Sequence, residues 1–315
     1  MPFYSKQEGG FVISAAIQKY MYVIVSKRLH KNILLSYSKS EVCESLNDIQ
    51  HPVIKECLKF TNLSDHLVIL SYADITAQSG LGSSGSFTVG LLHSLLEYSG
   101  RYMAKSELAE LACHIQMDIL KQPSGKQDEY IATFGGISCF EIGKNGSVNV
   151  KPLSISDHAK ETLQNNLLFF NTGIKRSATE VLSDQKQTVA LNPENLEYLR
   201  KIKEIGMKIK TCLETDSVDD FGILMDEHWN EKKKTSKKIT TTLIDKHYQT
   251  AKNLGALGGK VIGAGGGGYM MFYVNDKKSK TNIKKEFLSK GMTEIKFPFE
   301  AEGTKIILNL LEGSE

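Results

Sequence analysis

Strand-like and helix-like segments are mixed along this chain without the regular alternation of a doubly wound parallel sheet. The elements predicted for its first half are strands at 11–17, 21–25, 32–37 and 67–71 and helices at 84–98 and 106–120. The first three strands are expected to form an antiparallel meander. This order predicts an α+β fold.

The second half continues the mixture, beginning with a hairpin around Gly-Lys-Asn-Gly. Its predicted elements are strands at 137–142, 147–152, 167–171, 269–274, 294–299 and 304–310 and helices at 194–226 and 242–254, with a further lysine-rich helix near the end. A chain of 315 residues exceeds the usual size of a single hydrophobic core, so two domains are predicted. We place their boundary in the polar segment 154–166, which gives domains 1–158 and 159–315.

The composition is that of an ordinary globular protein, with 41% hydrophobic and 24% charged residues. A net charge of +3 is too small to indicate a nucleic-acid partner, but it allows a small anionic ligand. No apolar run reaches membrane-spanning length and no signal-peptide layout is present, so a cytoplasmic protein without a membrane partner is expected. The five scattered cysteines predict buried free thiols.

The stretch "QSGLGSSGSFTVGLL" (78–92) combines bare backbone and hydroxyl groups just before a predicted helix. Gly80, Gly82 and Gly85 would let backbone N–H groups approach an anion, and the helix adds the positive end of its dipole. The alternative is a tight turn with serine N-caps. Phosphate is the favoured ligand, because the hydroxyls of Ser83, Ser84 and Ser86 can bind phosphate oxygens or a phosphate-bound Mg²⁺.

Two common nucleotide motifs do not account for this loop. A Walker loop requires a lysine, and none lies between Gly80 and Leu92. Gly80, Gly82 and Gly85 satisfy GxGxxG, but another predicted helix follows where a dinucleotide fold needs a strand with an acidic end. The second GxGxxG, which begins at Gly263, runs into a strand and fails the same test.

A second constellation lies in "QMDILKQPSGKQDEYIATFGG" (116–136). A Pro-Ser-Gly turn between Asp118 and Asp128 would fold both carboxylates toward one point, where they suit Mg²⁺ or can orient an acceptor hydroxyl and take its proton. Helix capping is the structural alternative for both residues. It is the better interpretation of Asp118 taken alone, whereas the surroundings of Asp128 favour function.

The third stretch, "GGKVIGAGGGGYMMFYV" (258–274), contains four consecutive glycines before a predicted strand. Such a run indicates a loop whose backbone passes very close to a ligand or to another segment of backbone. A glycine-rich hairpin without a ligand explains the run less well.

In this order, "SGLGSSGS", "GKQD" and "GAGGGG" resemble three motifs of the GHMP small-molecule kinases, which include galactokinase and the homoserine, mevalonate and phosphomevalonate kinases. Within that family, "GKQDEYIATFGG", "NTGIKRSA" and "DEHWNEKKK" most resemble the D-glycero-D-manno-heptose 7-phosphate kinases. The resemblance covers nearly the whole chain. It implies an N-terminal domain like ribosomal protein S5 domain 2 and a ferredoxin-like C-terminal domain.

Carried over residue by residue, the resemblance implies Asp128 as the catalytic carboxylate, with Ser84 and Asp118 as Mg²⁺ ligands. Asp118 stands in for a glutamate that is usual in the family. The ATP phosphates would be held by Ser79, Gly80, Leu81, Gly82, Ser83, Ser84, Gly85 and Ser86. The acceptor would be bound by Lys126, Gln127, Thr172, Arg176, Gly265, Gly266 and Gly267.

The start of the chain departs from the family pattern. Family members open with a strand and a "GGGTD"-like turn, whereas "PFYSKQEGGFVISAAI" (2–17) resembles the segment after that turn. The chain is therefore expected to begin late, without the first motif.

The implied reaction is phosphoryl transfer from Mg-ATP to the anomeric hydroxyl of a heptose 7-phosphate, for nucleotide-activated heptose and surface polysaccharide. Its partners would be ATP, Mg²⁺ and a phosphosugar, and a homodimer is left open. The alternatives are a fucose-type or galactose-type GHMP kinase, a catalytically dead nucleotide-binding protein and, least favoured, a dinucleotide-dependent oxidoreductase.

Overall fold

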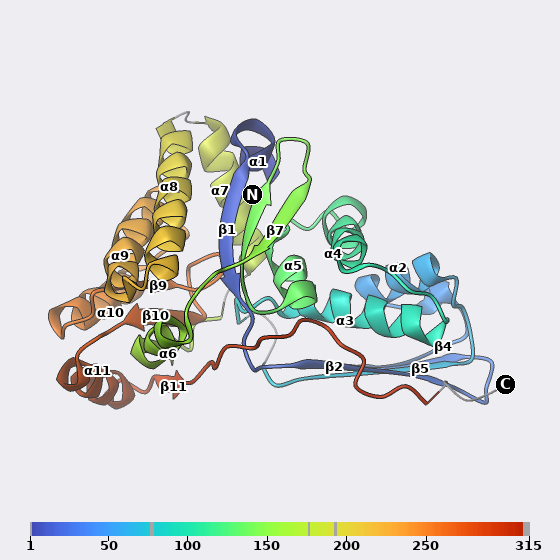
Figure 1. Cartoon of the computed structure of the whole chain (residues 1–315). Coiled ribbons are helices and arrows are strands. Elements are labelled where there is room, and N and C mark those ends of the chain that lie inside the picture. Colours follow the sequence, from blue (N-terminus) through green and yellow to red (C-terminus); the bar gives the residue numbers. More distant parts are fainter. Residues whose placement is uncertain (1, 76–78, 176, 192–193, 311–315) are drawn as a thin grey trace. The chain divides into compact units, whose positions relative to one another are not determined.

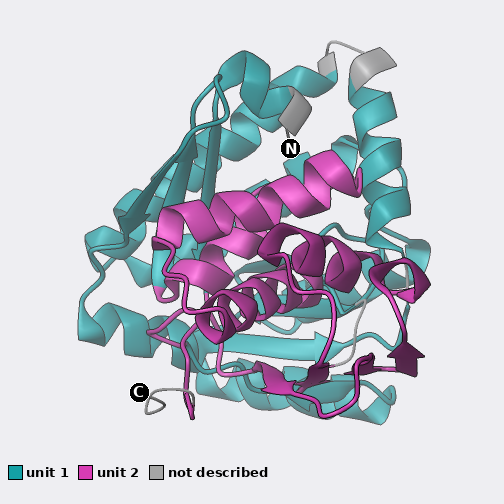
Figure 2. Cartoon of the chain, turned by 90° about the vertical axis from the view of Figure 1, so that its right-hand side faces the viewer, with its two compact units in different colours: residues 1–15, 78–81, 137–299 teal, residues 16–77, 82–136, 300–315 magenta. Residues whose placement is uncertain are grey.

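The computed structural model describes residues 2–75, 79–175, 177–191 and 194–310 (Figure 1). The chain forms two compact units, each assembled from segments far apart in sequence (Figure 2). Unit 1 comprises residues 1–15, 78–81 and 137–299, and unit 2 comprises residues 16–77, 82–136 and 300–315. Because the units interleave along the chain, the domain boundary between residues 158 and 159 stays a prediction.

Unit 2 is built on a four-stranded sheet of order β2-β5-β3-β4. Its strands are β2 (Met21–Lys27), β3 (Ile33–Ser36), β4 (Ser40–Cys43) and β5 (Leu67–Ala73). Strands β3 and β5 are parallel, and the other neighbours are antiparallel. The antiparallel strand β4 brings the chain back to the start of β3, because Cys43 and Leu67 both pair with Ile33, and the segment that contains α2 then joins β4 to β5 at that end of the sheet.

The helices of unit 2 are η1 (Leu46–Asp48), α2 (Pro52–Thr61), α3 (Ser83–Tyr98), α4 (Lys105–Cys113), η2 (His114–Ile119) and α5 (Gln127–Phe134). Helix α3 contributes Leu91, Leu92 and Leu95 to a fully buried cluster that also contains Ile33 and Leu35 of β3. The apolar face predicted for residues 84–98 therefore anchors α3, and with it the glycine-rich turn at its start.

The Phe-Gly-Gly turn after α5 is explained by a second segment of unit 2. A Cβ atom on Gly135 would lie 2.1 Å from the carbonyl carbon of Glu302, so only glycine lets the chain at 302–303 pass there. The N–H of Gly136 donates to the carbonyl of Glu300 at 3.0 Å, and Thr304 N–H donates to Ala132 at 2.8 Å. These contacts tie residues 300–304 to the end of α5.

Unit 1 contains a three-stranded sheet, β1-β6-β7, and a four-stranded sheet, β11-β8-β10-β9. The strands are β1 (Gly10–Ala15), β6 (Ile137–Ile142), β7 (Val148–Pro152), β8 (Leu167–Asn171), β9 (Gly258–Val261), β10 (Tyr269–Tyr273) and β11 (Thr293–Ile295). The helices are α1 (Pro2–Glu8), α6 (Asp157–Asn166), α7 (Ala178–Leu191), α8 (Glu194–Glu214), α9 (Val218–Lys234), α10 (Thr242–Asn253) and α11 (Lys277–Ser289).

Strand β10 separates two apolar cores of unit 1. Met270 and Phe272 belong to one core, together with Trp229 of α9, whereas Met271 and Tyr273 belong to or pack against the other. Side chains alternate along a strand, so the apolar run "YMMFY" is buried on both faces. Helices thus cover both faces of the β11-β8-β10-β9 sheet.

Several predicted elements are confirmed, including the hairpin of β6 and β7, but the predicted meander is wrong. Strand β1 pairs antiparallel with β6, far along the chain, and not with β2. The apolar pattern of a strand does not determine its partner, and sequential strands are neighbours only about two-thirds of the time.

Three further predictions need correction. The helix predicted at 194–226 is two helices, because Asp216 adopts a left-handed φ of 59° between α8 and α9. Residues 304–310 are not a strand, and only Thr293–Ile295 is a strand where 294–299 was predicted.

Candidate active site

The second part of the predicted phosphate loop, which begins at Gly82, belongs to unit 2 and leads directly into α3. Gly82 is the N-cap of α3, with a left-handed φ of 75°, and Ser83 and Ser84 are its first helical residues. The first turn has no acidic residue. Its backbone N–H groups and the positive end of the helix dipole therefore suit an anion.

Asp128, predicted as the catalytic residue, lies against this turn. A Cβ atom on Gly82 would lie 3.3 Å from the carboxyl carbon of Asp128, and one on Gly85 would lie 2.8 Å from its Cβ atom. The loop and α5 can approach this closely only because both positions are glycine. The structure thus brings together two motifs that are more than 40 residues apart in the sequence.

The surroundings of Asp128 alter its acidity. The residue is exposed, so a ligand can reach the carboxyl group. The neighbouring loop and helix nevertheless displace water, and this desolvation raises the pKa of the Asp128 carboxyl above its ordinary value. A raised pKa makes the carboxylate a stronger proton acceptor, as a general base requires.

Glu129, the next residue, is buried at 3% exposure. Its Oε2 atom has no hydrogen-bond partner among the described residues. Burial, followed by the charge of Asp128, raises the pKa of Glu129 to about 8. Near neutral pH this carboxyl is therefore held in its protonated form.

The protonation of Glu129 should make folding stability fall with increasing pH. The folded state binds a proton more tightly than the unfolded state, whose pKa is near 4.5, so stability is lost as pH rises toward about 8. We expect the melting temperature of the wild type to fall over this range, and that of Glu129→Gln to fall less. Equal slopes for the two proteins, measured by differential scanning calorimetry, would contradict this account.

Gln116 is a site residue that the sequence did not reveal. It is 3% exposed, and its amide nitrogen lies 2.8 Å from Ser84 Oγ and 2.6 Å from Thr88 Oγ1. It belongs to η2, a π-helical turn, which displaces side chains from their α-helical positions. The signal in the sequence that could have identified Gln116 was its polar side chain within an apolar repeat.

Among the described residues, no hydrogen bond joins Asp118, the predicted second Mg²⁺ ligand, to Ser84. Its carboxylate lies 2.9 Å from Nδ1 of His114, and its side chain is 67% exposed. Ser84 and Asp128 still supply hydroxyl and carboxylate oxygens at one end of α3, and Mg²⁺ prefers such ligands together with phosphates and water. The start of α3 therefore fits Mg²⁺ without Asp118.

The two remaining predicted residues of this motif differ in their contacts. Nζ of Lys126 lies 2.6 Å from both carboxylate oxygens of Glu110, which also accepts a hydrogen bond from the Tyr130 hydroxyl. Gln127 begins α5 and is exposed. Lys126 is thus already engaged by a carboxylate, whereas Gln127 is open to solvent.

In unit 1, the first part of the phosphate loop packs against the second glycine-rich loop. A Cβ atom on Gly263 would lie 2.7 Å from the carbonyl oxygen of Gly80, and one on Gly268 would lie 2.5 Å from that of Ser79. Both glycines have left-handed φ angles. Their backbone contact explains the glycines at the ends of this loop without any ligand.

The middle of the second glycine loop is held by its neighbours in unit 1. The N–H of Gly266 donates to Ile239 at 2.6 Å, and both the N–H and the hydroxyl of Thr172 donate to the carbonyl of Gly268. A Cβ atom on Gly267 would lie 2.6 Å from the carbonyl oxygen of Ile174. Thr172 therefore positions the loop, and Arg176 lies outside the described residues.

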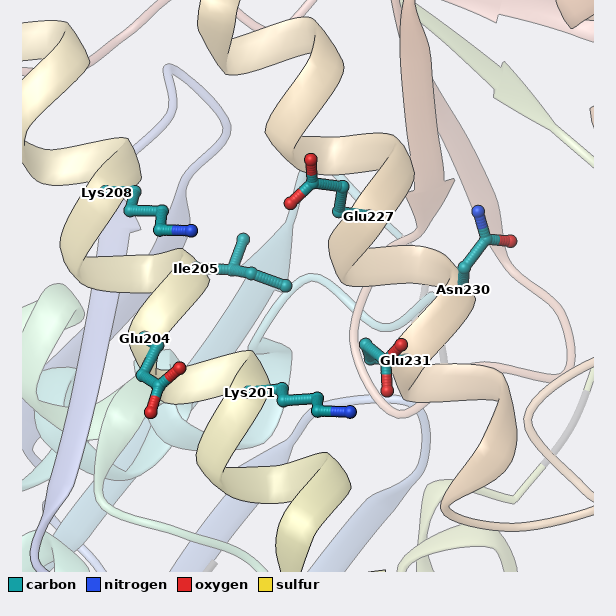
Figure 3. A pocket seen from close by; sticks show the side chains of 7 residues that line it. All are labelled: Lys201, Glu204, Ile205, Lys208, Glu227, Asn230 and Glu231. Carbon is teal, nitrogen blue, oxygen red and sulfur yellow. The ribbon is translucent and has the colours of Figure 1, made fainter.

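A separate pocket of about 420 Å³ lies between α8 and α9 (Figure 3). Its lining residues are Lys201, Glu204, Ile205, Lys208, Glu227, Asn230 and Glu231. It contains none of the residues predicted for catalysis or ATP binding, and its charges are of both signs. We do not assign the chemistry to it.

Comparison with known proteins matches the family model "GHMP kinases N terminal domain" to residues 51–136 and "GHMP kinases C terminal" to residues 209–292. A D-glycero-alpha-D-manno-heptose 7-phosphate kinase of Campylobacter jejuni is 29% identical over 96% of this chain and 92% of its own. A mevalonate kinase of Methanocaldococcus jannaschii is 28% identical over 73% of this chain and 70% of its own.

Solved structures agree with this assignment at the level of the fold. The crystal structure of a D-glycero-D-manno-heptose 1-phosphate kinase from Bacteroides thetaiotaomicron has a TM-score of 0.78, with 24% identity over 97% of this chain and 93% of that chain. The α+β two-domain fold predicted from the sequence is thereby confirmed. The two matched family models together span more than half of the chain, which therefore belongs to the GHMP kinases, a family of ATP-dependent small-molecule kinases.

Proposed function

We propose that this protein transfers the γ-phosphoryl group of ATP to the anomeric hydroxyl of D-glycero-D-manno-heptose 7-phosphate, giving the 1,7-bisphosphate. The observation that carries the proposal is the similarity to a heptose 7-phosphate kinase along almost the full length of both chains. The heptose 1-phosphate kinase with the same fold supports a heptose phosphate as the class of acceptor.

In the proposed reaction, the backbone N–H groups at the start of α3 hold the ATP phosphates, assisted by the hydroxyl of Ser84. Mg²⁺ bound with ATP neutralises charge on the phosphates. Asp128 orients the anomeric hydroxyl and takes its proton as the oxygen attacks the γ-phosphorus. Such transfer depends on positioning and electrostatics more than on covalent chemistry with the protein.

The acceptor is assigned to residues of the segments "GKQD", "NTGIKRSA" and "GAGGGG". We assign the sugar to Gln127, Thr172 and the glycines at 265–267. Thr172 acts by holding that loop through the carbonyl of Gly268. Lys126 and Arg176 complete the proposed set of acceptor-binding residues. Lys126 belongs to this set while its ammonium group is paired with Glu110.

The experiment that tests this function is ADP release by the purified chain with Mg-ATP and a panel of acceptors. D-glycero-D-manno-heptose 7-phosphate is compared with mannose 6-phosphate, galactose, fucose and no acceptor. We expect release that depends on the heptose phosphate. Faster release with galactose or fucose would replace the proposal with an unphosphorylated sugar as substrate, and ATP binding without release for any acceptor would indicate a catalytically dead protein.

A further inference from the structure

Strand β9 and helix α9 of unit 1 run in direct contact. A Cβ atom on Gly258 would lie 2.0 Å from the carbonyl oxygen of Gly222 and 2.6 Å from the backbone nitrogen of Asp226. A side chain at position 258 would therefore point toward α9. Because strand side chains alternate between faces, Lys260 points to the same side, further along the helix.

Two basic residues of α9 lie along this contact between β9 and α9. Nζ of Lys232 donates to the carbonyl of Gly263 at 2.6 Å, which places it where β9 runs into the second glycine loop. His228 is four residues earlier in α9, one helical turn away on the same face. His228, Lys232 and Lys260 thus form a basic cluster that ends at Gly263, the residue that packs on Gly80 of the phosphate loop.

The acidic residues of α9 are directed elsewhere. Asp226 is bound by the Tyr248 hydroxyl at 2.7 Å and by Lys252 at 3.3 Å. Glu231 pairs with Lys234 at 2.6 Å, and Glu227 lines the pocket that faces α8 (Figure 3). Within the described part of the chain, no ion pair is formed by Lys260 and no hydrogen bond by Nδ1 of His228.

Desolvation and nearby positive charge lower the pKa values of two members of the cluster. Desolvation lowers the pKa of Lys260 to about 8. Burial, and then the charges of Lys260 and Lys232, lower the pKa of His228 well below its ordinary value. All three residues nevertheless remain partly exposed. A bound anion would offset these costs, since it stabilises the charged forms.

We propose that His228, Lys232 and Lys260 bind the phosphomonoester group of the phosphosugar acceptor. This inference deepens the proposed function and rests on it, because it names the residues that would distinguish a phosphorylated from an unphosphorylated sugar. A phosphomonoester carries close to two negative charges near pH 7 and accepts several charge-assisted hydrogen bonds. The terminal phosphate of ATP has the same chemistry, so the test must separate the two sources.

The test compares ligand binding to the full chain and to Lys260→Met by isothermal titration calorimetry. We expect binding of heptose 7-phosphate to weaken by about 10- to 100-fold and binding of ATP to change by less than about twofold. Lys260→Arg should restore part of the affinity. Lys237→Met is the control for loss of one positive charge, because Lys237 is an exposed lysine that follows α9 in unit 1 and is outside the cluster. The melting temperature of Lys260→Met should not fall, since a desolvated charge is removed.

Two outcomes would overturn the proposal. Weaker binding of ATP alone would assign the cluster to the nucleotide, and unchanged binding of the phosphosugar would remove it from phosphate recognition. If the wild type does not bind the heptose phosphate, inorganic phosphate and mannose 6-phosphate serve as probes, with the His228 imidazole followed by NMR. An upward shift of the His228 pKa with either probe supports the cluster, whereas no shift refutes it independently of the proposed function.

Discussion

Replacing Asp128 by asparagine is expected to reduce turnover by about 10²- to 10⁴-fold, the range for loss of general acid–base catalysis. Asparagine preserves the shape that packs on Gly82 and Gly85 but cannot accept the proton of the acceptor hydroxyl. The affinity for ATP should change little, because the phosphates are assigned to the start of α3. Single-turnover kinetics together with an ATP titration measure the two effects separately.

The pH dependence provides a second readout for Asp128. Only the carboxylate can take a proton, so kcat/KM of the wild type should rise with pH through the raised pKa of this group. The rise should be absent from the residual activity of Asp128→Asn. Asp157→Asn, an exposed acid in the first turn of α6, is the control for loss of one negative charge. Turnover of Asp128→Asn at the wild-type rate would remove Asp128 from the mechanism.

Gly85→Ala is expected to have the second-largest effect, because it inserts a methyl group between α3 and α5. The new Cβ atom would lie 2.8 Å from Asp128 Cβ and 3.0 Å from the backbone of Asp128 and Glu129, so part of α5 must move. We expect a loss of about 1–3 kcal/mol in unfolding free energy. Displacing the carboxylate by about 1 Å should also cost about 100-fold in turnover.

Gly90→Ala is the matched control in the same helix. Its Cβ atom would meet only Val23 Cγ2, at an ordinary 3.5 Å, and alanine favours the helix by up to about 1 kcal/mol. Chemical denaturation and steady-state kinetics should therefore separate the two variants. Wild-type turnover in Gly85→Ala would show that the contact with Asp128 does not position the catalytic group.

Local chemistry made much of the site predictable. The left-handed turn at Gly82, the helix that begins at Ser83 and the tight passage at Gly135 each depend on residues adjacent in sequence or on the absence of a side chain. The order of the three motifs then indicated the family, which the comparisons show. Asp128, predicted as the catalytic carboxylate, lies beside Gly82 and Gly85 of the phosphate loop.

Other features depended on which distant segments meet. The amide of Gln116 donates to Ser84, whereas the carboxylate of Asp118, two residues later in the same π-helical turn, lies beside Nδ1 of His114. Lys126 is paired with Glu110 across two helices, and β1 finds its partner in β6. Periodicity and spacing contain no information about these pairings, since long-range packing decides them.

The sequence by itself determined most element types, the glycine-dependent turns and the candidate catalytic carboxylate, because these follow from backbone sterics and the chemistry of single residues. Only the tertiary structure decided the environment of each ionisable group. Glu129 and Lys260 read as ordinary charged residues in the sequence, yet burial gives both a pKa of about 8. Desolvation depends on every atom packed around a group, and those atoms come from segments that the sequence does not place side by side.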